Sequence, residues 1–221
     1  MESAPPIREI FDRLLAAYGP QGWWPAETAF EVIVGAVLVQ NTRWENVERA
    51  IAGIKSAGVL DPHALHRLSA EELQELIRPA GVFRVKAKRL AAVLTYLVEE
   101  HNGDTASLAQ TPSGQLRREL LALHGVGPET ADSILLYAAE HPSFVIDAYT
   151  RRVLERHGWA EPTASYDQLQ RLFETALPRD APLFNEYHAL IVEVGKRHCR
   201  RTPKCEGCPL ECLLPDSRPA N

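Results

Sequence analysis

The chain has 221 residues, with 24 basic and 29 acidic side chains and a formal net charge of −5. At 45% hydrophobic and 24% charged residues, its composition is that of a soluble globular protein and excludes a disordered chain. The longest apolar run, Val32–Val39, has 8 residues and is too short to span a bilayer. No signal peptide is expected, because no long apolar core follows the first residues. The acidic balance argues against coating of nucleic acid by bulk charge, but it leaves open a local basic face.

Apolar residues recur at helical spacing along most of the chain, and almost no run alternates apolar and polar residues. The predicted fold class is therefore all-α. The first helix is expected from Ile7 to Tyr18, before Gly19 and Pro20, and a mostly apolar segment at 27–40 predicts a buried helix. Further helices are expected at 43–57, from the capping-box residue Ser69, and at 86–100, 115–123, 129–139, 147–157, 166–177 and 183–198.

A glycine-rich turn, Leu123-His124-Gly125-Val126-Gly127-Pro128, separates two of these helices. Gly125 and Gly127 would permit a tight turn with positive φ, and Pro128 suits the first position of a helix. Free backbone N–H groups at such a helix start form a site for phosphate. An ordinary corner between two packed helices is the alternative interpretation.

The four cysteines, Cys199, Cys205, Cys208 and Cys212, all fall within the last 23 residues. A disulfide scaffold would join distant segments, so this grouping instead indicates one metal or iron–sulfur site in a reducing cytosol.

The segments LHGVGPETADSILLYA and FVIDAYTRRVLERHGW, followed by the cysteine cluster, resemble the helix–hairpin–helix DNA glycosylases of the endonuclease III superfamily. The resemblance extends from about Phe30 to Cys212. It implies a six-helix barrel lobe at 22–140 that contains the hairpin. It also implies a discontinuous cluster lobe, at 1–21 and 141–221, with DNA in the groove between the two lobes and the damaged nucleotide flipped into it.

Asp147 follows the apolar stretch Phe144–Ile146 and precedes a basic helix, where an aspartate commonly caps the helix N-terminus. The resemblance implies that it is the catalytic aspartate, which stabilises positive charge on the deoxyribose and helps to position water. Bifunctional relatives carry a Schiff-base lysine in the pattern G-V-G-x-K-T-A, but here Glu129 stands at that position. We therefore expect a monofunctional glycosylase without efficient lyase activity.

Three of the 4 tryptophans lie early in the chain, in the WWP and QNTRWENV segments. These segments, with FNEYHALIVEVGK, resemble the 3-methyladenine glycosylase III branch of the superfamily, which implies that aromatic faces stack on a methylated base. Packing in the core is the alternative role for each tryptophan. The implied base pocket consists of Trp23, Trp24, Pro25, Trp44 and Lys196.

Other residues are expected to contact DNA. Gln40 matches the family glutamine that fills the space left by the flipped nucleotide, and Asn41 assists it; a solvent-facing helix position is the alternative for Gln40. The remaining expected contacts are Gly125, Val126, Gly127, Thr130 and Arg151. Three basic runs, at 84–89, 151–152 and 196–204, are expected to contact phosphates, with solvated charged faces as the alternative.

The cysteine spacing is C-x5-C-x2-C-x3-C, shorter at two intervals than the usual C-x6-C-x2-C-x5-C of the family. The resemblance implies a 4Fe–4S cluster with a structural role, and zinc is the alternative metal. The 3-methyladenine branch typically lacks this cluster, so the chain combines features of two branches.

The sequence thus predicts a base excision repair enzyme that hydrolyses the N-glycosidic bond of a damaged base, most readily an alkylated purine such as 3-methyladenine. The alternative substrates are mismatched thymine or uracil and oxidised pyrimidines, and the alternative classes are a catalytically silent DNA-binding protein and an iron–sulfur redox module. The expected partner is double-stranded DNA. We expect a monomer in the cytoplasm, associated with the nucleoid in a prokaryote and with no membrane contact.

Overall fold

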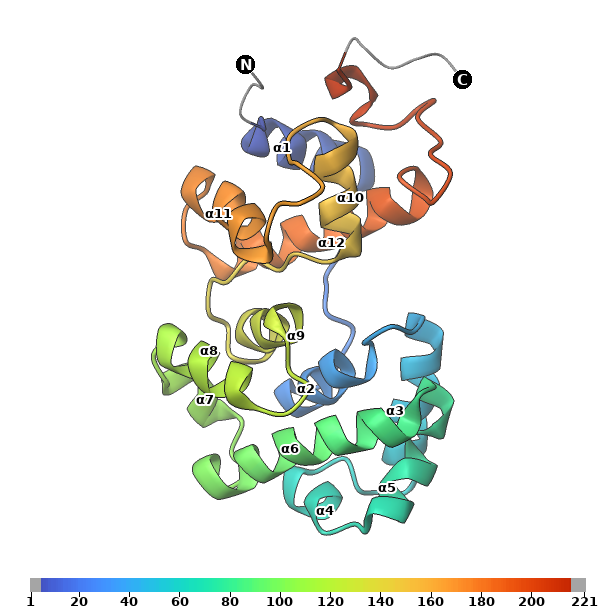
Figure 1. Cartoon of the computed structure of the whole chain (residues 1–221), viewed down its shortest axis with the longest axis vertical. Coiled ribbons are helices and arrows are strands. Elements are labelled where there is room, and N and C mark those ends of the chain that lie inside the picture. Colours follow the sequence, from blue (N-terminus) through green and yellow to red (C-terminus); the bar gives the residue numbers. More distant parts are fainter. Residues whose placement is uncertain (1–4, 216–221) are drawn as a thin grey trace. The chain divides into compact units, whose positions relative to one another are not determined.

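The computed structural model describes residues 5–215, and every regular element in that range is helical, which confirms the all-α prediction (Figure 1). Residues 1–4 and 216–221, which form the two ends of the predicted cluster lobe, lie outside the described residues. No helix in the described part of the chain is long and apolar enough to cross a membrane.

The chain divides into two compact units. One, here called the hairpin unit, is Trp24–His141; the other, here called the cysteine unit, joins Met1–Trp23 to Pro142–Asn221. The helices of the hairpin unit are α2 (Ala29–Leu38), α3 (Trp44–Ser56), α4 (Pro62–His66), α5 (Ala70–Leu76), η1 (Arg78–Ala80), α6 (Phe83–His101), α7 (Ala106–Gln110), α8 (Ser113–Ala122), α9 (Pro128–Ser133) and η2 (Ile134–Ala138).

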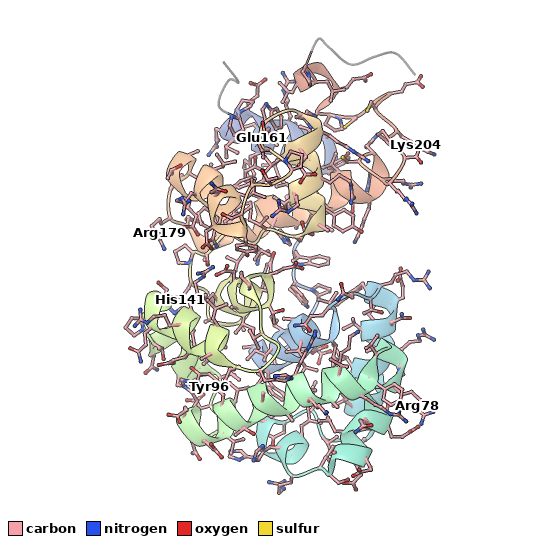
Figure 2. The ribbon with its side chains drawn as sticks, in the orientation of Figure 1. Arg78, Tyr96, His141, Glu161, Arg179 and Lys204 are labelled. Atoms are coloured by element: carbon pink, nitrogen blue, oxygen red, sulfur yellow. The ribbon has the colours of Figure 1, made fainter. Side chains whose placement is uncertain are left out.

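The hairpin unit is built around α2, which is buried from Phe30 through Leu38, as the apolar segment predicted. It packs against α3, α6, α9 and η2 (Figure 1). Its buried acid, Glu31, is paired with Lys55 Nζ at 3.0 Å, so the charge does not stand alone in the core. On the outer side, the Tyr96 hydroxyl of α6 (Figure 2) donates to Glu119 Oε2 of α8 at 2.7 Å.

Three short helices, α4, α7 and η1, lie between the predicted ones because they hold too few residues for a periodic pattern. The first did have a local signal: Asp61 accepts a hydrogen bond from Ala64 N, and Pro62 occupies the first turn. The predicted helix at 129–139 is two elements, since the α-helical turns of α9 give way to the π-helical turn η2. The capping box of Ser69 and Glu72 is confirmed.

The cysteine unit contains α1 (Ile7–Tyr18), α10 (Ala148–Arg156), α11 (Tyr166–Ala176), α12 (Ala181–Arg197) and η3 (Glu211–Leu213). Its core contains a cluster of aromatic rings. The Phe144 and Phe173 rings stack with centroids 3.9 Å apart, and the rings of Phe184 and Tyr187 meet Phe144 edge-on. The Tyr187 hydroxyl donates to Ile7 O at 2.7 Å, which ties α12 to α1.

Candidate functional site

The turn between α8 and α9 depends on one of its two glycines. Gly125 has φ +77°, and a Cβ there would lie 2.3 Å from Cγ of Arg89. Gly127 has φ −96° and ψ 177°, so the expectation of positive φ is right for Gly125 and wrong for Gly127. Gly127 instead precedes Pro128 in extended backbone as the N-cap of α9, and the side chain of Val126 is buried.

Gln40 connects the end of α2 to this turn. Its Nε2 donates to Gly125 O at 3.2 Å and to Thr130 Oγ1 at 2.9 Å, while Arg89 Nη1 of α6 donates to its Oε1. Both ends of the amide are therefore used, and the half-buried Gln40 is held in place from three directions. The next residue, Asn41, is exposed and has φ +54°.

A buried ion pair joins the two helices of the hairpin. Arg117 Nε and Nη2 on α8 lie 2.8 and 3.0 Å from the two carboxylate oxygens of Asp132 on α9. Asp132 is completely buried, so this bidentate geometry compensates a charge that water cannot reach. The pair fixes how α8 and α9 lie against each other, and with them the turn that they flank.

Glu129 lies in the first turn of α9 and is exposed. A carboxylate at a helix N-terminus is favoured by the partial positive charge of the helix end, which provides a local reason for an acid at this position. The next residue, Thr130, is buried against Gln40.

The predicted base-pocket residues fall into two groups. In the hairpin unit, the Trp24 ring contacts Trp44 edge-on with centroids 5.2 Å apart, and it meets Tyr137 at 5.1 Å. Gly35 makes this cluster possible, because a Cβ there would lie 3.3 Å from Trp24 and 3.6 Å from Trp44. Trp44 Nε1 donates to Glu48, and Pro25 is exposed.

Trp23 and Lys196 belong to the cysteine unit. The Lys196 ammonium lies 5.5 Å from the centroid of the Trp23 ring, within the range of a cation–π interaction. The segment before Trp23 is fastened to α12, since Gln21 N donates to Glu186 Oε1 at 2.7 Å.

Asp147 is the N-cap of α10. Its Oδ1 accepts a hydrogen bond from Thr150 N at 2.7 Å, and its side chain is 14% exposed. The preceding segment is pinned to α11, because Ile146 N donates to the Tyr166 hydroxyl at 3.2 Å. The second carboxylate oxygen faces the buried ring of His188 on α12.

Several residues of the basic runs are engaged within the protein and are therefore less available for contact with phosphate than the sequence predicts. Lys86 is buried and donates to Ala80 O at 2.6 Å, so the prediction that it contacts phosphate is wrong. Burial lowers the pKa of Lys86, and Arg89 adds to the effect. Arg151 donates to Ala164 O at 2.8 Å, and Arg152 donates to Cys199 O at 2.5 Å.

The third run surrounds the cysteines. Arg156 on α10 donates to the carbonyl oxygens of Arg200 and Arg201 at 2.5 and 2.8 Å, which holds the segment after α12 against α10. Lys204 on this segment is exposed (Figure 2).

Three of the four cysteines line one apolar pocket. Cys199, Cys205 and Cys208 share it with Val153 and Leu210, and Cys208 N donates to Cys205 O at 2.9 Å in the CxxC turn. Burial raises the pKa of the Cys208 thiol, and the charges of Cys205 and Cys199 add to this. Cys212 is exposed in η3, and the described residues contain no group of three or more His, Cys, Asp or Glu side chains arranged to hold a metal ion. Four thiols are the donor set that an iron–sulfur cluster takes, but the described side chains are not gathered around one point in this structure.

Two exposed apolar residues were not among the residues predicted to form the site. Val82 is 66% exposed at φ +47°, an uncommon conformation for a β-branched residue, and Val85 is 41% exposed. They lie three residues apart at the start of α6, and Arg89 follows one turn later on the same helix face. This apolar face therefore leads to the residues that hold Gln40 and the hairpin. The local signal was the GVFR sequence, where a valine follows a glycine directly at a helix start.

The family model for HhH-GPD superfamily base excision DNA repair proteins matches residues 34–179, which include the hairpin, Asp132 and Asp147. The chain belongs to this superfamily of helix–hairpin–helix DNA glycosylases, as its sequence predicted. The matched region ends before the first cysteine of the tail.

The chain is similar to two curated relatives and to one solved structure, among others. A Methanocaldococcus jannaschii protein, provisionally named a DNA repair glycosylase, is 49% identical over 211 residues, covering 94% of this chain and 96% of the relative. Endonuclease III of Thermotoga maritima is 31% identical over 82% of this chain and 80% of its own length. The crystal structure of H. pylori 3-methyladenine DNA glycosylase, MagIII, bound to 1,N6-ethenoadenine is 28% identical, with a TM-score of 0.76, covering 86% of this chain and 95% of that one.

Proposed function

We propose that this glycosylase is monofunctional: it removes a damaged base from double-stranded DNA with water and does not cut the strand efficiently. The observation that carries the proposal is the presence in one chain of Asp147, at the start of α10, and of Glu129, at the position where bifunctional relatives have lysine. A carboxylate stabilises the positive charge that develops on the sugar, but it cannot form a Schiff base.

The role of Asp147 is tested with Asp147→Asn. Asparagine caps a helix about as well as aspartate, so the variant retains the start of α10 and loses only the negative charge. We expect single-turnover base release to fall on the order of 10²- to 10³-fold. Asp147→Ala should lose activity and also about 1 kcal/mol of stability. Full activity of Asp147→Asn would refute the assignment.

The absence of lyase chemistry is tested by borohydride trapping on DNA that contains an abasic site. We expect no covalent adduct with the wild type, because Glu129 offers no amine. Glu129→Lys places an amine on the exposed side of the first turn of α9, and we expect it to trap detectably. Efficient trapping of the wild type would overturn the monofunctional proposal.

An alkylated purine is the substrate that we propose. Trp24, Trp44 and Tyr137 form a cluster of aromatic faces, which suits a base that carries positive charge. The similarity to MagIII, which was crystallised with a modified adenine, supports the same substrate class.

A panel of 3-methyladenine, 7-methylguanine, hypoxanthine, U:G, T:G and thymine glycol substrates tests the substrate proposal. We expect release of 3-methyladenine to be fastest. Preferential release of mismatched thymine or uracil, or of thymine glycol, would establish the alternative substrates. Tight binding without release of any base would establish a catalytically silent protein.

Within the hairpin unit, we propose that DNA contacts the surface that includes the turn, Gln40 and the exposed face of Val82 and Val85. Turn N–H groups would bind phosphate, and the apolar side chains would contact bases. Val82→Glu should weaken binding of lesion DNA at least tenfold, on the order of 1.4 kcal/mol. Val59→Thr, at a half-buried position in the segment that follows α3, serves as the control.

For the cofactor, we propose that Cys199, Cys205, Cys208 and Cys212 hold a 4Fe–4S cluster. When bound, such a cluster supplies structural support for the surrounding loop. Anaerobic purification with iron, sulfide and zinc analysis tests this. Stoichiometric zinc without iron in a colourless protein would establish zinc instead.

A further inference from the structure

The carboxylate of Asp147 is held from two sides. One oxygen accepts the hydrogen bond of Thr150 N at 2.7 Å, while the other lies 3.7 Å from Nε2 of His188. The His188 side chain is 7% exposed and projects from the middle of α12, a different element from the one that Asp147 caps. Asp147 thus has one neighbour on its own helix, Thr150, and one that is distant in sequence, the imidazole of His188 on α12.

Close packing of α10 on α12 creates this arrangement. Gly195 of α12 lies directly against the ring of Tyr149, where an added Cβ would be 2.3 Å from a ring carbon. His188 precedes Gly195 by seven residues, two helical turns, and therefore lies on the same face of α12. Tyr149 follows Asp147 by two residues. The contact between Tyr149 and Gly195 therefore places the start of α10 close to the face of α12 that carries His188.

The ring of His188 is suited to orient a carboxylate without neutralising it. Burial lowers the pKa of His188, and the Asp147 carboxylate opposes this shift. A neutral imidazole carries one N–H, which can donate to a carboxylate oxygen. The 3.7 Å separation in the free protein is longer than a hydrogen bond, and such distances commonly shorten when substrate binds.

We propose that His188 is a positioning residue for base excision, with Nε2–H directed at Asp147 so that the carboxylate is aimed at the sugar. This inference rests on the proposed catalytic role of Asp147. His188 acts through Asp147 and makes no contact of its own with DNA.

Three variants test the role. His188→Leu removes the donor, His188→Gln retains an N–H donor, and Tyr187→Phe is the matched control. Tyr187 is the adjacent buried residue on α12, and its hydroxyl serves Ile7 rather than Asp147. The measurements are unfolding by urea, affinity for DNA with an uncleavable abasic analogue, and single-turnover base release across pH.

We expect His188→Leu to slow base release on the order of tenfold while its DNA affinity stays within about twofold of wild type, because misplacing a reacting group costs rate rather than binding. His188→Gln should recover most of the rate, and Tyr187→Phe should lose stability without slowing release.

Equal slowing of base release by His188→Leu and Tyr187→Phe, or no recovery of the rate in His188→Gln, would overturn the inference. A readout without catalysis separates it from the proposed function. In ¹⁵N spectra of the histidine rings, we expect the His188 Nε2 resonance to be protonated in a neutral ring and to shift in Asp147→Asn. An unprotonated Nε2 would refute the positioning role even in an active enzyme. If the spectra show the expected protonated Nε2 but no base is released, the proposed function is refuted, while the contact between His188 and Asp147 is confirmed.

Discussion

The two units hold their candidate site residues in different ways. In the hairpin unit, the turn is fixed by side chains distant in sequence: Gln40 from α2, Arg89 from α6 and the Arg117–Asp132 pair. In the cysteine unit, Asp147 is placed first by its own helix, through the Thr150 N–H. The hairpin therefore depends on tertiary contacts, whereas Asp147 depends chiefly on a local cap.

Because of this difference, we expect substitutions in the two units to change different quantities. Substitutions around the hairpin should first lower the free energy of unfolding, because they break buried contacts that join helices. A conservative substitution at Asp147 should first lower the catalytic rate, because asparagine retains the cap. Three substitutions test this contrast, in order of decreasing expected effect.

The largest effect is expected from Asp132→Asn. It leaves the partly buried Arg117 guanidinium without its counter-charge, and breaking one partner of a buried pair costs about 3–5 kcal/mol. Urea unfolding measures the loss. Arg78→Ala is the control, because its pair with Glu75 is exposed and should contribute less than about 0.5 kcal/mol. If both variants lost equally little, the ion pair would not be what fixes the hairpin.

A smaller effect is expected from Gly125→Ala. The new Cβ would meet Arg89 in a left-handed backbone, which costs about 1–2 kcal/mol before any displacement of Arg89. Gly127→Ala is the matched control, since a Cβ added at Gly127 would meet no atom within 4 Å and its φ is not positive. We expect Gly125→Ala alone to lose both stability and affinity for DNA. Equal behaviour of the two variants in unfolding and DNA-binding assays would contradict the geometry.

The smallest effect concerns pH and the cysteine unit. Because the folded-state pKa of His188 is lowered, the unfolded chain takes up a proton first as the pH falls through about 6.5. The contribution of the neutral ring is complete above that pH and is lost progressively toward the lower folded-state value. The free energy of unfolding of His188→Gln should therefore decline less between pH 7 and 5 than that of the wild type. An identical decline in the two proteins would show that folding does not lower the pKa of His188.

Much of the architecture could be predicted from local patterns. The apolar segment that forms α2, the Ser69 capping box and the stop at Gly19 all follow from side-chain chemistry within a few residues. The shift from α9 to the π-helical turn η2 could not be predicted in this way, because it depends on packing against other helices.

In the candidate site, too, local features could be predicted from the sequence and tertiary contacts could not. Asp147 and the hairpin were recognisable as motifs, but the partners of Gln40 lie 49, 85 and 90 residues away in sequence. The prediction for Lys86 was wrong for the same reason. A lysine within a basic run is expected to be exposed, and only the folded structure shows that Lys86 is buried and donates to Ala80 O. His188 gave no sequence signal, because its meaning comes from the approach of α12 to α10.

Helix α10 connects Asp147, at its start, with the cysteine segment, which contacts the helix near its other end. Asp147 begins it, and Arg152 and Arg156 near its other end hold the backbone of the cysteine segment. With 9 residues, the helix is a strut about 14 Å long. The cysteine segment and Asp147 are thus both held by this one helix, so a displacement of α10 would move the two together.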